Sequence, residues 1–226
     1  MLGDALPKAP PKKKERNAVE TKKRILAAAA TEFAAKGFDG ARLAVIAKTA
    51  GVQGALIHHY FSDKEGLHQE VVADGLAQMS EGIWQLVMEM DVESPKPKMK
   101  AKEMLRQLAR RFVELLVHFF ATNGDLIAIL QHESRRGDAA TTIVKDKVGP
   151  LFEAIVNKFE TMKKNGEVRR DLDSRHLVLS CVAMVFFPFQ QEALVSAIWP
   201  ADWHDAAFLE ERVEHIVGMV MGRVLP

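Results

Sequence analysis

A cluster of polar, basic and small side chains lies between positions 42 and 64 of this 226-residue chain. The carboxamide of Gln53 both donates and accepts hydrogen bonds, so it could pair with the edge of an adenine base. Gly54 and Ala55 are small and would let the backbone approach a ligand closely. The basic and aromatic members could hold phosphates and set the register. This combination predicts a surface that contacts double-stranded DNA, made of Arg42, Gln53, Gly54, Ala55, His58, His59, Tyr60 and Lys64.

The spacing of apolar residues in the same stretch predicts two short helices joined by a tight turn. From Leu43 to Ala50 apolar side chains recur every three or four residues, which places them on one helical face. Gly51 should end this helix, because glycine adopts the left-handed conformation without a Cβ penalty. The second helix is expected to bury Leu56, Ile57, Tyr60 and Phe61. Such a pair forms the helix-turn-helix corner of DNA-binding proteins, although the same pattern also occurs as a purely structural corner.

Helical patterns continue on both sides of this corner. Asn17 and Ser62 each precede a glutamate by three residues, which resembles the capping box that opens a helix. The helix that starts at Asn17 should end at Gly37, and the one after Ser62 should continue to Met90. Residues 17–62 are therefore expected to form a small DNA-binding domain, and residues 63–226 a larger one.

Charge is unevenly distributed along the chain. The formal net charge is only +1, but the segment from Lys8 to Arg24 has an excess of six positive charges. Residues 1–16 combine lysines with prolines and cannot form a core, so we expect a disordered arm. This arm is either a solubilising tail or a basic segment that lies along DNA. The single cysteine, Cys181, excludes an internal disulfide and suits a reducing compartment, which indicates a cytoplasmic protein.

The rest of the chain shows helical periodicity and no strand alternation, so the predicted fold class is all-α. The longest apolar run is 13 residues, Leu177 to Phe189, which is too short to cross a membrane. A new helix should begin after Gly149 and Pro150, and Pro188 should kink or end the helix that contains it. The expected helices span residues 99–122, 125–136, 151–164, 176–187, 190–199 and 205–224.

The helical stretches near the C-terminus predict self-association. The stretch from His176 to Phe187 is apolar nearly all round, which requires burial on all sides. A chain of this size usually achieves such burial by pairing with a second copy. We therefore expect a homodimer through the helices at about 174–199 and 205–224, which would form a four-helix interface.

Three motifs together resemble the tetracycline-repressor (TetR) family of bacterial regulators. They are AAKGF at the end of the first helix, the corner LAVIAKTAGVQGALIHHYF, and SDKEGL after it, within residues 17–67. The resemblance implies a dimeric DNA-binding repressor whose C-terminal domain binds a small effector. The chain departs from the family at Arg42, where a Ser or Thr cap is usual. It also departs at Gln53, Leu56 and His58, where Ser, Thr and Tyr are usual.

An effector pocket is expected among the long middle helices, where aromatic and methionine side chains could line a cavity. Few charged residues face inward in these helices, so the effector should be largely apolar. Tilting the helix of residues 63–90 would change the spacing of two recognition helices and release the DNA. The candidate pocket residues are Trp84, Met88, Met104, Phe112, Phe119, Phe120, Ile127, Leu130, Phe152, Phe159, Met184 and Phe187.

Other functions are less well supported by the sequence. It contains no glycine-rich phosphate loop, no nucleophile elbow and no paired metal-ligand spacing, so we expect neither an enzyme nor a cofactor. No metal site is expected either: His58 and His59 are adjacent and diverge by about 100° on a helix. His118, His132 and Glu133 are more often structural. A helical dimer that binds small molecules or proteins and has lost DNA binding is an alternative, and the sign of regulation, the operator and the effector remain open.

Overall fold

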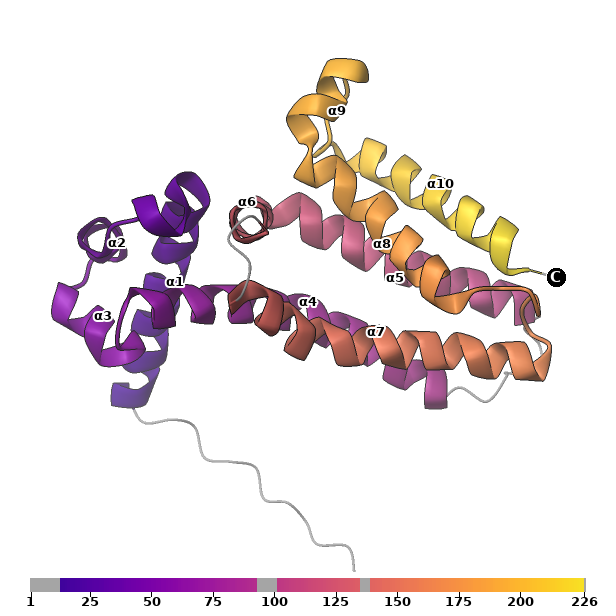
Figure 1. Cartoon of the computed structure of the whole chain (residues 1–226), viewed down its shortest axis with the longest axis horizontal. Coiled ribbons are helices and arrows are strands. Elements are labelled where there is room, and N and C mark those ends of the chain that lie inside the picture. The colour runs from indigo at the N-terminus through magenta and orange to yellow at the C-terminus, as the bar shows by residue number, and fades with distance from the viewer. Residues whose placement is uncertain (1–12, 93–100, 135–138, 226) are drawn as a thin grey trace, which may run out of the picture. The chain divides into compact units, whose positions relative to one another are not determined.

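A computed structural model describes residues 13–92, 101–134 and 139–225 of the chain (Figure 1). All regular elements within these ranges are helices, which confirms the predicted all-α class. The chain divides into two units, residues 1–71 and 72–226, and the division falls inside the long helix α4. The helices are α1 (Lys13–Gly40), α2 (Leu43–Ala50), α3 (Gly54–Phe61), α4 (Lys64–Val92), α5 (Ala101–Thr122), α6 (Gly124–Glu133), α7 (Ala139–Asn165), α8 (Ser174–Gln190), α9 (Glu192–Ile198) and α10 (Ala206–Val224).

Helix α1 begins earlier than the sequence pattern predicts. It starts at Lys13, so the prediction of disorder is wrong for residues 13–16, while residues 1–12 lie outside the described ranges. Asn17 is not an N-cap, because it lies inside α1, four residues after its start; its carbonyl accepts a hydrogen bond from the Thr21 hydroxyl at 2.7 Å. Gly37 interrupts the helical conformation, as predicted, with φ 64°. Only one more turn follows that kink before α2.

The first unit has a small apolar core contributed by α1, α2, α3 and the start of α4. Its most deeply buried members include Ile25 and Phe33 of α1, Ile46 of α2 and Ile57 of α3, each at most 1% exposed. Asp63, and not Ser62, caps α4: its carboxylate accepts a hydrogen bond from the Gly66 amide at 2.7 Å. Because α2 and α3 bury one side in this core, the opposite side of each helix faces outward.

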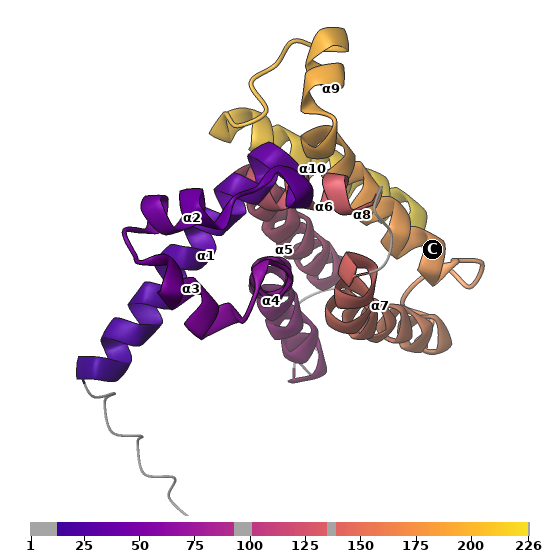
Figure 2. The ribbon, with the colours of Figure 1, turned by 60° about the vertical axis from the view of Figure 1, so that its left-hand side comes forward.

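In the second unit α5 packs against α6, α8 and α10. Figures 1 and 2 show α8 and α10 side by side over α5. Two arginines of α5 also pair with glutamates of α10: Arg106 lies 2.6 Å from Glu214, and Arg110 lies 2.6 Å from Glu210. None of the described helices alone is long and apolar enough to cross a membrane, although two sharply bent helix pairs reach that limit when taken together.

Pro150 and Pro188 both lie inside helices. Helix α7 starts at Ala139 and contains Pro150, so the predicted start at Leu151 is wrong. Pro150 is exposed, so the carbonyl that it leaves without a helical donor can bond to water. Helix α8 contains the buried Pro188 and ends two residues later at Gln190.

The structure explains how α8 tolerates Pro188. Proline has no N–H, so the carbonyl of Met184, four residues earlier, loses its helical donor. Arg212 of α10 replaces that donor, because its Nη2 lies 2.8 Å from the Met184 oxygen. Burial lowers the pKa of Arg212. This hydrogen bond ties α10 to the C-terminal part of α8, which contains Pro188.

We predict that Arg212→Met lowers the free energy of unfolding by about 1 to 3 kcal/mol, because it leaves the Met184 carbonyl unsatisfied. In a Pro188→Ala background the alanine N–H can bond to Met184, so the same Arg212 substitution should cost clearly less. Urea denaturation of the four proteins measures this coupling. Equal costs in both backgrounds would contradict the proposed replacement of the donor.

Candidate functional site

The corner of the first unit has the predicted geometry. Gly51 adopts the left-handed conformation (φ 65°, ψ 40°) directly after α2. The amide of Val52 donates to the carbonyl of Ala47 at 3.0 Å, which closes the last turn of the helix. Helix α3 begins only three residues after Gly51. The two predicted helices and the glycine stop between them are therefore confirmed.

Helix α3 presents one face to the core and one to solvent. Ile57 and Phe61 are buried, and the other residues of α3 are exposed or, at Tyr60, half-buried. Tyr60 is only half-buried, and its ring contacts that of His59 at 5.3 Å between centroids. Five residues that were predicted to face outward are exposed: Gln53, Gly54, Ala55, His58 and His59.

The prediction that Leu56 is buried is wrong. Its side chain is 37% exposed and lies on the outer half of α3, three residues after Gln53. An exposed leucine on a recognition helix can contact the methyl group of thymine. The sequence contained the signal, because a helix that buries Ile57 and Phe61 turns position 56 about 100° away from them. Leu56 is therefore a further candidate for contact with DNA.

The candidate phosphate ligands differ in how freely they can move. Arg42 is exposed at the start of α2. Its side chain does not cap the helix, as expected for a residue without a hydroxyl group. Its backbone N–H donates a hydrogen bond to the Glu32 carboxylate at 3.2 Å. The Lys64 ammonium donates to the carbonyl of Asp39 at 3.3 Å and lies over the Phe38 ring. His58 is held by its Nδ1, 3.0 Å from the Ser62 carbonyl. Arg42 can thus reach outward, whereas Lys64 and His58 are held in place.

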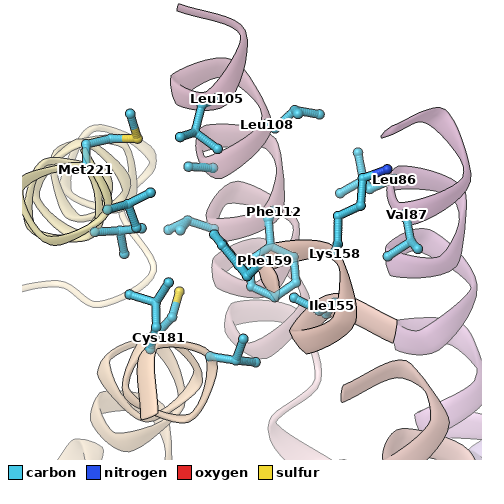
Figure 3. Close-up of a pocket in the computed structure, with 16 residues that line it drawn as sticks. Leu86, Val87, Leu105, Leu108, Phe112, Ile155, Lys158, Phe159, Cys181 and Met221 are labelled. Atoms are coloured by element: carbon cyan, nitrogen blue, oxygen red, sulfur yellow. The ribbon is translucent and has the colours of Figure 1, made fainter. Parts of the chain in front are cut away.

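The second unit contains an apolar cavity between its helices (Figure 3). The cavity itself holds about 80 Å³, and the empty space reaches about 770 Å³ only when the part that opens to solvent is included. Leucine, valine and isoleucine supply most of the lining, from α4, α5, α7, α8 and α10. Such a lining suits the body of an apolar molecule.

Only two of the twelve predicted pocket residues, Phe112 and Phe159, line this cavity. Met88 and Phe187 are 60% and 55% exposed, so the prediction that they point inward is wrong. Met184 borders a separate groove between α8 and α10. Phe120 and Ile127 are buried but do not line the cavity. The other predicted residues are half-buried and also lie outside the lining: Trp84, Met104, Phe119, Leu130 and Phe152.

Sequence reasoning missed two lining residues with distinctive chemistry, Lys158 and Cys181. Lys158 lies one turn of α7 from Ile155 and next to Phe159, a helical spacing that could have identified it. Burial raises the pKa of the Cys181 thiol to about 12, so it is protonated and unreactive at neutral pH. Within the described ranges no three His, Cys, Asp or Glu side chains are grouped to hold a metal ion.

Two family models match the chain. Residues 25–71 match the model described as bacterial regulatory proteins of the tetR family. Residues 106–220, half of the chain, match the model of a tetracyclin repressor-like C-terminal domain. The first match covers the corner and the candidate DNA-binding residues, and the second covers α8 and most of α5 and α10.

Two curated relatives come from Bacillus subtilis and are described as HTH-type transcriptional regulators. YdgC is 41% identical over 56 residues, which make up 25% of this chain and 29% of YdgC. YttP is 24% identical over 211 residues, which cover 88% of this chain and 91% of YttP. The families and relatives that the chain matches are thus regulators and not enzymes.

Solved structures share the fold over nearly the whole chain. AibR, in complex with isovaleryl coenzyme A and operator DNA, has a TM-score of 0.66 at 15% identity and covers 90% of this chain and 99% of its own. FadR from Bacillus subtilis, in complex with stearoyl-CoA, has a TM-score of 0.60 at 21% identity and covers 86% of this chain and 97% of its own. At these identities the similarity supports the fold alone.

Proposed function

Because the chain belongs to the TetR family of bacterial regulators, we propose that it is a dimeric repressor which a largely apolar small molecule releases from its operator DNA. The observation that carries this proposal is the exposed outer face of α3. That face presents a carboxamide, two small residues and two imidazoles around a glycine corner.

On this proposal α3 lies in the major groove of double-stranded DNA. Gln53, at the N-cap of α3, pairs with adenine, while Gly54 and Ala55 allow close approach. Arg42, His58, His59, Tyr60 and Lys64 contact phosphates and set the register. The positions of His58 and Lys64 favour this role, because side chains held in place lose less entropy on binding.

A homodimer supplies two such helices. On α8 and α10, Leu179, Phe187 and Met219 are more than half exposed in the single chain, although all three are large and apolar. A second copy that covers this face would bury them in a four-helix interface. The two recognition helices must then lie about 34 Å apart to reach successive major grooves.

The cavity provides a site through which an effector could control this spacing. AibR and FadR, which share the fold, were each solved with a coenzyme A thioester. In this chain α4 contributes Leu86 and Val87 to the cavity wall and begins beside the DNA-binding corner. A ligand that binds better to the conformation with misaligned recognition helices shifts the population away from DNA.

Mobility shift of the protein with its own upstream DNA, across a salt series, tests the proposal. We predict salt-dependent binding, and we predict that Gln53→Ala weakens it by about 5- to 150-fold, the effect of losing one bidentate base contact. Gln69→Ala is the matched control, because Gln69 is an exposed carboxamide of the same unit that bonds to Glu65 of α4 and lies outside α2 and α3. Its affinity should equal that of the wild type.

The absence of binding to that DNA and to a random-sequence pool would contradict the proposal. It would favour the alternative of a helical dimer that binds small molecules or proteins and has lost specific DNA binding. A loss that is equal for Gln53→Ala and Gln69→Ala would instead contradict the role assigned to Gln53.

A further inference from the structure

Two hydrogen bonds join His58 and Ser62 where helix α3 ends. The backbone amide of Ser62 donates to the carbonyl of His58 at 3.2 Å. In return, Nδ1 of the His58 ring lies 3.0 Å from the carbonyl oxygen of Ser62. A carbonyl oxygen can only accept a hydrogen bond, so Nδ1 must be the nitrogen that carries a proton. The Ser62 carbonyl therefore fixes the tautomer of the neutral His58 ring.

The backbone conformation of Ser62 favours retention of this bond. Its φ is 64° and its ψ is −62°, and no other residue except glycine has a positive φ in the described ranges. The Asp63 amide donates to the Phe61 carbonyl at 2.7 Å, which closes a three-residue turn around Ser62. Such a turn is strained and persists only when its surroundings hold it. Because the His58 ring is one of the groups that hold it, we expect the ring to stay bonded to Ser62 when DNA binds.

The second ring nitrogen of His58, Nε2, is the one left for a ligand. In the neutral ring with a proton on Nδ1, Nε2 has a lone pair and no proton to donate. The oxygens of a DNA phosphate also act only as acceptors, so the neutral ring and a phosphate cannot form a hydrogen bond. A proton added at Nε2 turns the ring into a cation that donates a charge-assisted hydrogen bond to phosphate. His58 can therefore hold a phosphate only in its doubly protonated form.

The charged groups around α3 leave DNA as the main anion for this cation. Neighbouring elements supply six charged side chains near the corner: Lys22 of α1, Arg42 and Lys48 at α2, and Asp63, Lys64 and Glu65 at the start of α4. Both carboxylates among them are already bonded, Asp63 to the Gly66 amide and Glu65 to the Gln69 carboxamide. The other four are cations. A DNA phosphate is thus the anion best placed to hold a proton on Nε2.

We propose that binding of operator DNA takes up one proton at His58 of each chain, so that the affinity for DNA rises as the pH falls. The inference rests on the proposed function for the contact between His58 and phosphate, and it adds control by pH to that site. A histidine side chain in water titrates near about pH 6.5. If the bound form holds the proton more tightly than the free form, affinity is highest at low pH and decreases as the pH rises through this region.

His59 provides the comparison on the same helix. Its ring contacts Tyr60, and in the described part of the chain no hydrogen bond holds either of its nitrogens. The neutral ring of His59 can therefore place its single proton on whichever nitrogen faces a phosphate. A contact of His59 with DNA requires no second proton, although the two histidines are adjacent and both exposed.

Nuclear magnetic resonance of the full-length protein with ¹⁵N-labelled histidine tests the first step without DNA. At about pH 8 we expect His58 in the tautomer with a proton on Nδ1, assigned by comparison with His58→Gln. A neutral His58 ring with its proton on Nε2 would overturn the inference, because that ring could donate to phosphate without a second proton.

Binding to the upstream DNA of the protein at constant ionic strength tests the second step. In the wild type we expect affinity about 10- to 100-fold higher at about pH 6 than at about pH 8, as for a hydrogen bond to a charged group. His58→Gln should lose most of this dependence, because a carboxamide donates at every pH without a charge. His59→Gln should keep the dependence, even if its affinity is lower at each pH.

Titration calorimetry in two buffers of different ionisation enthalpy counts the protons directly, so the outcome does not depend on how well His58→Gln folds. We expect wild-type protein near pH 7.5 to take up protons when it binds DNA, and His59→Gln to take up the same number. Tight binding without proton uptake would overturn the inference and leave the proposed function intact, as would equal pH dependence in the wild type and His58→Gln. Absence of DNA binding at every pH would contradict the proposed function, and this inference with it.

Discussion

Leu179→Asp combined with Phe187→Asp is expected to convert the protein into a monomer that binds operator DNA at least about 100-fold more weakly. Both side chains lie on the outer side of α8, where they are 60% and 55% exposed in the single chain. Two aspartates per subunit would place four carboxylates in the proposed interface, where burial of unpaired charge is costly. DNA affinity falls because each monomer holds only one half-site.

The exposure of these residues makes the test specific. A substitution at an exposed position usually changes the stability of the folded chain by less than about 0.5 kcal/mol. The double variant should therefore stay helical and melt as a folded protein. Light scattering coupled to size exclusion measures its mass, and mobility shift measures its affinity for DNA.

Met88→Asp is the control for this experiment. Met88 is 60% exposed on α4 of the same unit, outside α8 and α10. The Met88→Asp variant should remain dimeric and bind DNA with the affinity of the wild type. A monomeric wild type that binds its operator tightly would refute the dimer, and a double variant that stays dimeric would show that another face joins the subunits.

The sequence predicted the DNA-binding corner well because its signals are local. Gly51 must adopt a left-handed conformation to join α2 to α3, and few residues other than glycine do so. The three- and four-residue spacing around Ile46 and Ile57 marks the buried faces without any knowledge of the rest of the fold. Each of these features depends only on residues within one turn of the chain.

The fate of Pro188 and the lining of the cavity were harder to predict for a different reason, which is contact between distant parts of the chain. The sequence could not decide whether Pro188 kinks or ends its helix, because nothing local shows that Arg212, twenty-four residues later, supplies the missing donor. The cavity was assigned to aromatic residues by their size. Whether a side chain such as Phe120 fills the core or borders a void depends on how five helices pack together, and periodicity shows only which way it faces.

Gly66→Ala should lower the free energy of unfolding of the first unit by about 2 to 3 kcal/mol and abolish DNA binding at elevated temperature. A Cβ atom at position 66 would meet the carbonyl oxygen of Phe61 well inside van der Waals contact. This oxygen belongs to the backbone, so it cannot rotate away from the new Cβ atom as the end of a side chain could. The connection from α3 to α4 would have to move, and the Asp63 cap on the Gly66 amide would be strained with it. Amide hydrogen exchange in the full-length protein measures the loss as faster exchange in α1, α2 and α3.

The destabilisation predicted for Gly66→Ala is opposite to the usual effect of replacing a glycine by alanine in a helix. Replacing glycine by alanine within a helix normally stabilises a protein by about 0.5 to 1 kcal/mol, because alanine loses less backbone entropy on folding. Gly54 of α3 provides the comparison, since no atom lies within 4 Å of a Cβ built there. Gly54→Ala should therefore leave exchange in the first unit unchanged or slower. Similar exchange in the two variants would show that the chain from Phe61 to Gly66 adjusts freely, and the position of α3 would then not depend on that glycine.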